Sequence, residues 1–218
     1  MAERRAFDLT LYLVAGSEAV GDRPLAEVVA AAVRGGVTLV QLREKTLPDD
    51  AMIALARQIK DELQPSGIPL IINDRVEVAL AAGAEGVHLG VDDLSASEAR
   101  ARLGPARILG VSAGTAAEAA LVDPRLADYV GVGSVYATVT KPDAGPPIGL
   151  AGLADLGSRI PLPVVAIGGI GGAQAEAVMA SGVAGIAVVS AICGAADPEA
   201  AARDLRAKIA AGRARFRA

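Results

Sequence analysis

Short apolar runs alternate with amphipathic segments along the whole chain, and this alternation is the main structural signal in the sequence. The apolar runs are rich in Val, Ile and Leu and lack the every-second-residue polarity of a half-exposed strand. Such runs are typical of parallel strands that are buried on both faces. We therefore predict strands at residues 9–14, 37–40, 69–72, 86–90, 108–112, 128–133, 163–167 and 185–189.

Helix signals fall between these runs. Pro24 and Pro48 stand where helices begin, Gly83 stands where one ends, and Ser95 with Glu98 three residues later matches a capping box. The predicted helices cover residues 24–34, 48–63, 76–82, 95–103, a segment beginning at 115, 150–156, 172–180 and 198–211.

Eight strand–helix units predict an α/β protein with one closed (β/α)8 TIM barrel. A doubly wound open sheet is the alternative, and it is less favoured because no Gly-x-Gly-x-x-Gly turn follows the first strand. No linker or composition break divides the chain, so we predict a single domain over residues 1–218.

Composition narrows the class of function. The net charge is −4 and only 2% of the residues are aromatic, whereas a nucleic-acid surface needs basic stripes and stacking rings. No apolar run approaches the roughly 20 residues of a membrane span. We therefore expect no nucleic-acid or membrane partner, and the sequence leaves open whether the chain forms a homo-oligomer.

Cysteine and histidine are both scarce. Cys193 is the only cysteine, which excludes an intrachain disulfide and suits a reducing cytoplasm. His88 is the only histidine, so a multi-histidine metal site is excluded and a Ser-His-Asp triad would have to use it. Taken alone, a histidine on an apolar strand is more often a hydrogen-bonded core residue than a ligand.

Polar residues gather after the predicted strands, where barrel enzymes build their active sites. The starts of the strands carry nothing comparable. The residues at the strand ends are Gln41, Arg43, Lys45, Asn73, Asp74, His88, Asp93, Ser112, Thr138, Thr140, Lys141, Gly168, Gly169, Val189 and Ser190.

Three cations form the first candidate anion site. Gln41, Arg43 and Lys45 alternate, so on an extended chain they project to one side, and Lys141 adds a charge from a distant loop. A guanidinium suits bidentate contact with phosphate. The alternative is that residues 43–45 form a solvated loop whose charges pair with one another.

Two aspartates follow neighbouring strands, so the carboxylates of Asp74 and Asp93 can converge beside these cations. Two hard oxygen ligands beside an anion site suit Mg²⁺, which keeps waters and accepts diphosphate oxygens. The alternative is that either aspartate caps the next helix or pairs with Arg75. Of the neighbouring pair, we expect Asp92 to be the surface residue, although the sequence does not decide whether Asp92 or Asp93 binds the metal.

A second anion site is predicted after the last two strands. Gly168 and Gly169 would let backbone N–H groups approach a phosphate, with Val189 and Ser190 on the neighbouring loop. The alternative is a pair of ordinary glycine turns. The residues therefore indicate a barrel enzyme that takes one substrate with a diphosphate leaving group and another with a monophosphate.

An ordered set of motifs resembles the thiamine-phosphate synthase family. The motifs are Gln-Leu-Arg-Glu-Lys at 41–45, Asn-Asp-Arg at 73–75, His-Leu-Gly-x-x-Asp at 88–93, Gly-Val-Ser at 110–112, Thr-x-Thr-Lys-Pro at 138–142, Ile-Gly-Gly-Ile at 167–170 and Val-Val-Ser at 188–190. Each motif is weak alone, but the set is specific and spans nearly the whole chain.

The resemblance implies a transferase that joins 4-amino-5-hydroxymethyl-2-methylpyrimidine diphosphate to thiazole phosphate, giving thiamine phosphate and diphosphate by a dissociative substitution. It implies that Asp74 and Asp93 bind Mg²⁺. It places pyrimidine diphosphate at Gln41, Leu42, Arg43, Glu44, Lys45, Asn73, Ser112 and Lys141, with Arg43, Lys45, Ser112 and Lys141 as the catalytic residues. We also predict His88 as a substrate-binding residue. It places thiazole phosphate at Thr138, Val139, Thr140, Gly169, Val189 and Ser190.

One residue departs from the family pattern, because Val91 stands where members commonly carry glutamine. A thiazole tautomerase of the same superfamily and a non-catalytic phosphate-binding barrel remain as alternatives. The tautomerase would not need the paired aspartates together with Thr-x-Thr-Lys, and the non-catalytic barrel would not need a metal site. The long loop at residues 134–149 carries several proposed ligands, so we expect it to act as a lid.

Overall fold

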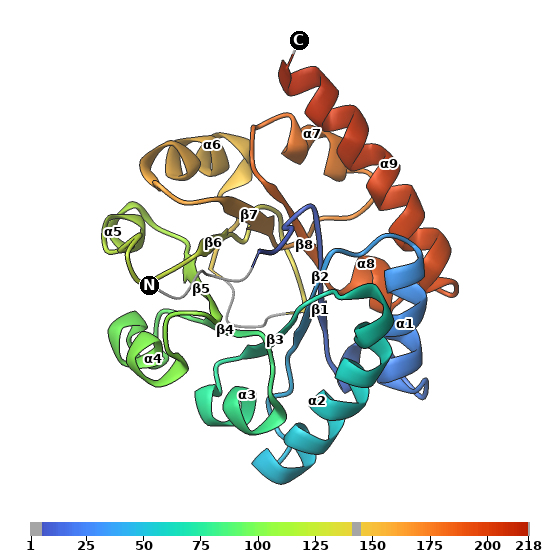
Figure 1. The fold of residues 1–218 in the computed structure, drawn as a ribbon. Helices are drawn as coiled ribbons and strands as arrows, with labels where there is room; N and C mark the ends of the chain where they lie inside the picture. The colour runs from blue at the N-terminus through green and yellow to red at the C-terminus, as the bar shows by residue number, and fades with distance from the viewer. Residues whose placement is uncertain (1–5, 141–144, 218) are drawn as a thin grey trace.

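The computed structural model describes residues 6–140 and 145–217. Eight parallel strands form a closed barrel in the order in which they occur along the chain, each hydrogen-bonded to the next and the last to the first (Figure 1). This confirms the predicted (β/α)8 architecture. The strands are β1 (Leu11–Ala15), β2 (Leu39–Leu42), β3 (Leu70–Asn73), β4 (Gly86–Leu89), β5 (Ile108–Ala113), β6 (Tyr129–Val132), β7 (Val164–Ile167) and β8 (Gly185–Val188).

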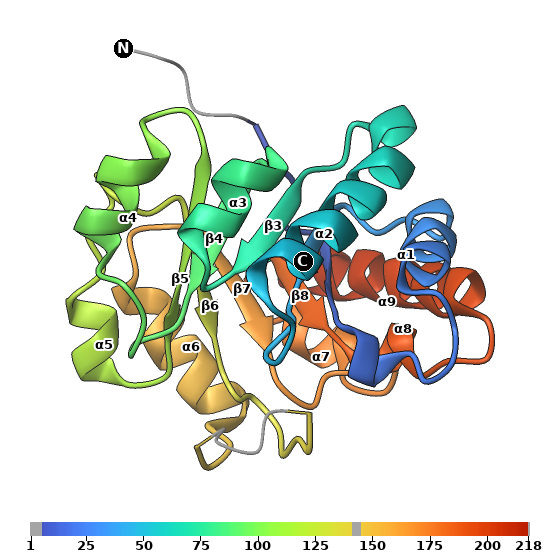
Figure 2. The same cartoon turned by 90° about the horizontal axis from the view of Figure 1, so that it is seen from below.

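Helices surround the barrel. They are α1 (Leu25–Arg34), α2 (Asp49–Leu63), α3 (Val76–Ala82), α4 (Ala96–Leu103), α5 (Ala116–Ala120), α6 (Gly149–Arg159), α7 (Ala175–Met179), α8 (Ser190–Cys193) and α9 (Pro198–Arg217), with short 3-10 turns at Ser17–Ala19 and Gln64–Ser66. Seen from the side, the described residues near the N-terminus lie at the opposite end of the barrel from the loop between β6 and α6 (Figure 2).

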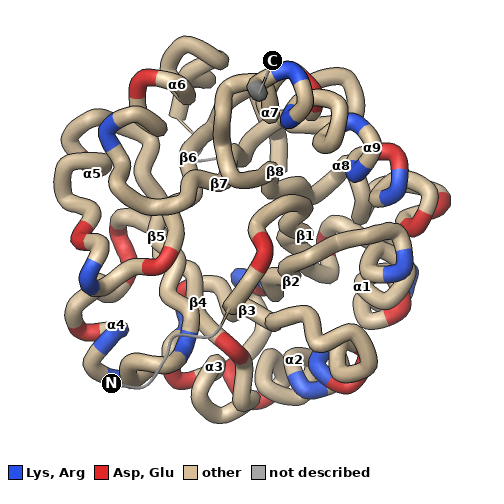
Figure 3. The backbone as a smooth tube through the Cα atoms, turned by 45° about the horizontal axis from the view of Figure 1, so that its top comes forward, with Lys and Arg blue, Asp and Glu red and all other residues tan. Residues whose placement is uncertain are grey.

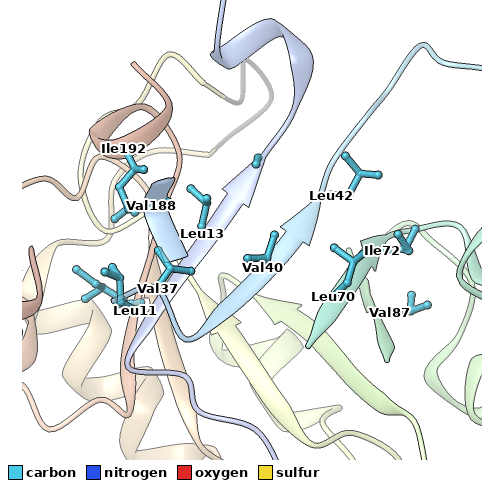
Figure 4. Close-up of a cluster of buried hydrophobic side chains, with 14 of the residues drawn as sticks. Leu11, Leu13, Val37, Val40, Leu42, Leu70, Ile72, Val87, Val188 and Ile192 are labelled. Atoms are coloured by element: carbon cyan, nitrogen blue, oxygen red, sulfur yellow. The ribbon is translucent and has the colours of Figure 1, made fainter. Parts of the chain in front are cut away.

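The apolar strands supply two separate cores. Alternate residues such as Leu13, Val40 and Ile72 face outward, where they are buried between the sheet and the helices (Figure 4). The intervening residues, including Tyr12, Ile71 and Tyr129, fill the barrel interior. Burial on both faces explains why the strands read as continuous apolar runs.

Two helices end differently from the prediction. The segment predicted at 150–156 is part of the longer helix α6, and α9 continues beyond the predicted end near residue 211 to Arg217. Gly212, which suggests a helix stop, lies inside α9, and a side chain there would meet the backbone carbonyl of Glu176. The glycine therefore allows α9 to pack closely on α7.

The region around α7 and α8 also differs. The helix predicted at 172–180 forms only over Ala175–Met179, because the chain before it is held in a turn in which Gln174 Oε1 accepts a hydrogen bond from the Gly171 N–H. The four-residue helix α8 has no counterpart in the prediction. Its shortness leaves no periodicity to detect.

Charged residues are spread around the ring of helices and the connecting loops, with both signs mixed (Figure 3). Within the described part of the chain, no helix has both the length and the apolar character needed to cross a bilayer. The ends of the strands nearest the loop between β6 and α6 form one face of the barrel, which we call the barrel mouth.

Candidate active site

The two predicted metal ligands meet at the barrel mouth. Asp74 follows β3 and Asp93 follows β4, and their carboxyl groups are hydrogen-bonded to each other. The loop after β4 fixes Asp93, since its Oδ2 accepts a hydrogen bond of 2.7 Å from the Gly90 N–H. Asp92 and Asp93 are both exposed, so it is the contact with Asp74 that distinguishes Asp93. The geometry thus brings Asp93 to Asp74.

Asp74 has an unusual conformation and an unusual acidity. Its φ of 63° is the only left-handed backbone among the described non-glycine residues. Partial burial, followed by the hydrogen bond and negative charge of Asp93, raises the pKa of Asp74 from 3.8 to about 7. Two carboxylates that repel each other in this way are stabilised when a cation binds between them.

Arg43 and Lys45 lie close enough to Asp74 to offset part of this repulsion. Both side chains act on Asp74 electrostatically and lower its pKa, although less than burial and Asp93 raise it. The structure therefore brings two predicted anion-binding cations to the aspartate pair. Lys141, the third, lies outside the described residues.

Arg75 holds the loop that carries those cations. Its guanidinium donates hydrogen bonds to the carbonyl oxygen of Leu47 at 2.6 Å and to that of Lys45 at 3.2 Å, and it forms an ion pair with Asp49 at 3.0 Å. The partner of Arg75 is thus Asp49 rather than Asp74. Sequence reasoning considered Arg75 only as a partner for the aspartates and missed this role.

The motif at residues 41–45 is not a solvated, self-paired loop. Glu44 is buried, and its Oε1 accepts hydrogen bonds of 2.6 Å from both the N–H and the hydroxyl of Ser17. Leu42 is fully buried and faces the outer core. The side chains of Glu44 and Leu42 therefore hold the loop and strand, while Arg43 and Lys45 follow the end of the strand.

Five polar side chains inside the barrel are linked in series. Gln41 donates a hydrogen bond of 2.6 Å to the hydroxyl of Tyr12, which lies 2.8 Å from the hydroxyl of Tyr129. The Tyr129 hydroxyl lies 3.0 Å from Nδ1 of His88. The series then reaches the predicted ligand Ser112, whose Oγ lies 3.0 Å from Nε2 of His88.

Sequence reasoning missed Tyr12 and Tyr129. Both are at most 1% exposed, and each sits in an apolar strand where a tyrosine is easily taken for core. A usable signal was present, because a buried tyrosine needs a partner for its hydroxyl and the barrel offers few polar groups.

The predicted phosphate residues surround a cavity of about 460 Å³ on the side of β6 to β8. Gln174 also lines it and was missed from the sequence, as its helix was predicted without a role. The lining residues are Ala137, Thr138, Val139, Thr140, Gly169, Ile170, Gly171, Gln174, Ser190 and Ala191. Val189, the remaining predicted residue, immediately precedes Ser190.

Both glycines after β7 have left-handed backbones, with φ of 99° at Gly168 and 63° at Gly169. A Cβ on Gly169 would lie 2.5 Å from the carbonyl oxygen of Ala137 and 2.8 Å from Cβ of Tyr136. Glycine is therefore required here by the loop after β6 as well as by any approach of a ligand.

The other predicted residues lie at or near the mouth. Asn73 ends β3 and is half-buried, while the side chain of Val91 is 57% exposed and that of Val139 is 96% exposed. Val91 thus offers an apolar surface at the position where the family pattern has an amide.

Comparison with known proteins agrees with this geometry. Residues 11–192 match the family model described as thiamine monophosphate synthase. The chain is 53% identical over 209 residues to a thiamine-phosphate synthase of Xanthobacter autotrophicus, covering 96% of this chain and 99% of that protein. A thiamine-phosphate synthase of Azorhizobium caulinodans is also 53% identical, covering 95% and 98% of the two chains.

A solved structure extends the likeness to three dimensions. The thiamine phosphate pyrophosphorylase of Pyrococcus furiosus superposes with a TM-score of 0.85 at 36% identity, covering 94% of this chain and 97% of that one. Sequence, barrel topology and the pairing at the mouth lead to one assignment. The chain belongs to the thiamine monophosphate synthase family of transferases.

Proposed function

We propose that this enzyme joins 4-amino-5-hydroxymethyl-2-methylpyrimidine diphosphate to thiazole phosphate, forming thiamine phosphate and releasing diphosphate. The observation that carries the proposal is the division of one mouth into two halves. The Asp74–Asp93 pair, with Arg43 and Lys45, lies on the side of β2 to β4. A cavity lined by Gly169 and Ser190 lies on the side of β6 to β8.

The first half would hold the diphosphate. Arg43 and Lys45 supply positive charge beside the aspartate pair, and Lys141 would add a third charge from the loop after β6. Asn73 ends β3 and Ser112 lies in β5, on the two sides of β4, and both can donate hydrogen bonds to the substrate. A fixed set of donors of this kind stabilises charge as it develops on a leaving group.

The carboxyl pair fits Mg²⁺. Among the described residues no group of three or more metal-ligating side chains converges, so the protein would supply only the two carboxylates of Asp74 and Asp93. Mg²⁺ is commonly held by one or two carboxylates while waters and substrate phosphates complete its shell. When bound, it would neutralise negative charge on the departing diphosphate.

The second half would hold thiazole phosphate. Gly169 presents backbone without a side chain, Ser190 begins α8, and Thr138 and Thr140 add hydroxyl groups from the loop after β6. Backbone N–H groups and hydroxyls are the usual donors to a phosphate monoester. The phosphate end would thus be fixed away from the reacting atoms, leaving the thiazole nitrogen to face the first half.

The proposed chemistry needs little acid–base help. The bond between the pyrimidine methylene carbon and the diphosphate oxygen breaks, and its electron pair leaves with diphosphate. The lone pair of the thiazole nitrogen then forms the new C–N bond, so no proton must be removed. A mouth rich in cations, whose only histidine contacts a tyrosine and a serine, suits this step.

The alternatives make different products. A thiazole tautomerase would isomerise its substrate without releasing diphosphate, and a non-catalytic barrel would only bind phosphate. Incubating the protein with both substrates and Mg²⁺ and separating the products by chromatography distinguishes the three. We expect equal amounts of thiamine phosphate and diphosphate, whereas an isomerised thiazole or unchanged substrates would refute the proposal.

A further inference from the structure

The series of polar groups inside the barrel has a direction that the orientation of the Gln41 amide determines. The amide nitrogen of Gln41 can only donate, so the Tyr12 hydroxyl oxygen accepts from it. That leaves the single hydroxyl hydrogen of Tyr12 to find an acceptor in a fully buried position. The Tyr129 oxygen, 2.8 Å away, is such an acceptor.

The remaining links follow from the first. Once the Tyr129 hydroxyl accepts from Tyr12, its own hydrogen can be donated to Nδ1 of His88, 3.0 Å away. Nδ1 then carries a lone pair, so the neutral imidazole has its proton on Nε2. Nε2 donates to Oγ of Ser112 at 3.0 Å, and the hydroxyl hydrogen of Ser112 is available to an acceptor in the mouth.

With the Gln41 amide oriented as in the structure, the opposite direction satisfies fewer groups. If Tyr129 donated to Tyr12, the Tyr12 hydrogen would have no hydrogen-bond acceptor within residues 6–140 and 145–217, because its two partners there would both donate to it. A buried hydroxyl hydrogen without an acceptor is unfavourable. Burial also raises the pKa of both tyrosines, so both hydroxyls keep their hydrogens.

The barrel makes room for this arrangement. A side chain at Gly110 on β5 would collide with the ring and hydroxyl of Tyr129. A Cβ at Gly131 on β6 would lie 3.2 Å from Cε1 of His88. Tyr129 itself is fully buried and packs edge-on to Tyr12, with ring centres 5.9 Å apart. Its hydroxyl thus has little freedom to choose other partners.

We propose that Tyr129 is a positioning residue that donates its hydroxyl hydrogen to Nδ1 of His88 and so directs the Nε2 hydrogen of that ring at Ser112, leaving Ser112 to act as a hydrogen-bond donor to the pyrimidine diphosphate. The tautomer rests on the hydrogen-bond geometry alone. The consequence for the substrate rests on the proposed function. Tyr129 does not need to touch the substrate for this effect.

The single histidine makes the tautomer directly measurable. We would label the protein with ¹⁵N-histidine, remove any purification tag that contains histidine, and record the ring nitrogen resonances at neutral pH. The protonated and unprotonated nitrogens resonate far apart. A neutral ring with the proton on Nε2 supports the proposal, and a proton on Nδ1 or on both nitrogens overturns it, whether or not the enzyme is active.

Tyr129→Phe tests the positioning role. It keeps the ring but removes the hydroxyl, so His88 should shift towards a mixture of tautomers. The KM for pyrimidine diphosphate should rise about five- to tenfold, the size expected for one disturbed hydrogen bond, while that for thiazole phosphate stays nearly constant. Unchanged resonances together with unchanged kinetics would overturn the proposal.

Val165→Ala is the matched control. Val165 lies in the same inner cluster and is 1% exposed, but it offers no side-chain hydrogen bond. Its truncation should lower stability without altering the His88 resonances or the ratio of the two KM values. If Val165→Ala reproduced both effects of Tyr129→Phe, the role of Tyr129 would be structural and the proposal wrong.

Discussion

The carboxyl groups of Asp74 and Asp93 share a hydrogen bond at the barrel mouth, although each residue follows a different strand. Two acidic groups in contact are unfavourable unless one holds a proton or a cation lies between them. In a site that releases diphosphate, such a cation would also neutralise charge on the leaving group. The first three predictions concern this pair.

Replacing Asp93 should abolish most of the metal requirement together with most of the activity. Asp93→Asn keeps the shape but removes one of two ligand charges, so turnover should fall by roughly two orders of magnitude or more. Asp92→Asn is the matched control, because Asp92 is exposed and adjacent. Titration of Mg²⁺ in activity assays of both variants tests this. Equal losses in the two would count against Asp93 as a ligand.

Metal affinity should depend on pH in a stated direction. Since the pKa of Asp74 is raised to about 7, the metal-free pair holds a proton below that pH and Mg²⁺ must displace it. Apparent Mg²⁺ affinity should therefore rise with pH up to about 7 and then level off. Calorimetric titration at several pH values measures it.

The same shift predicts the pH dependence of stability without metal. A carboxyl group whose folded pKa lies above its unfolded value stabilises the fold only while protonated, so the contribution falls as pH rises from about 4 to about 7. Thermal unfolding in EDTA should show this loss, and Asp93→Asn should reduce it. A wild-type midpoint that rises across that window would contradict the shift.

Replacing Arg75 should weaken the binding of pyrimidine diphosphate, although Arg75 is not itself a proposed ligand. Arg75→Ala removes the hydrogen bonds to the carbonyls of Leu47 and Lys45, so the loop carrying the cations loosens. The KM for pyrimidine diphosphate should rise roughly tenfold. Arg57→Ala, which removes a guanidinium on α2 that donates to the carbonyl of Ala81 in α3, should leave it unchanged.

Lys141→Ala should lower turnover through loss of a charge-assisted contact, by roughly 2–4 kcal/mol of transition-state stabilisation. Steady-state kinetics with both substrates gives the value. Arg203→Ala, which removes a surface cation paired with Glu199 on α9, is the control and should have no effect. A Lys141→Ala enzyme with wild-type turnover would remove Lys141 from the mechanism.

Gly169→Ala should affect thiazole phosphate more than pyrimidine diphosphate. Its Cβ would press on the loop at Tyr136 and Ala137, which forms the wall of the phosphate cavity. Gly67→Ala is the control, because Gly67 has the same left-handed backbone, with φ of 68°, in open space. Both variants should lose stability from backbone strain, but only Gly169→Ala should raise the KM for thiazole phosphate.

Much of the fold was predictable because each strand carries its own signal. Buried apolar runs gave all eight strands, and Gly83 ended α3 where the sequence indicated. The C-terminal ends of α6 and α9 were not predictable, since Gly157 and Gly212 look like helix breakers. Gly212 is instead explained by contact with α7, which depends on tertiary packing.

The site was predictable where chemistry stands at strand ends. Asp74, Asp93 and the phosphate cavity come together because parallel strands in a barrel all end on one face. The roles of Tyr12, Tyr129 and Arg75 depend on which strands are opposite and which loop lies alongside. That information is absent from the local pattern.

The central claim is that both halves of the mouth act in one metal-assisted substitution. A single-turnover experiment that follows diphosphate release and thiamine phosphate formation together, with and without EDTA, tests it most directly. We predict that both products appear at the same rate with Mg²⁺ and that chelation slows both by at least about a hundredfold. Diphosphate release at an undiminished rate in EDTA would contradict the account.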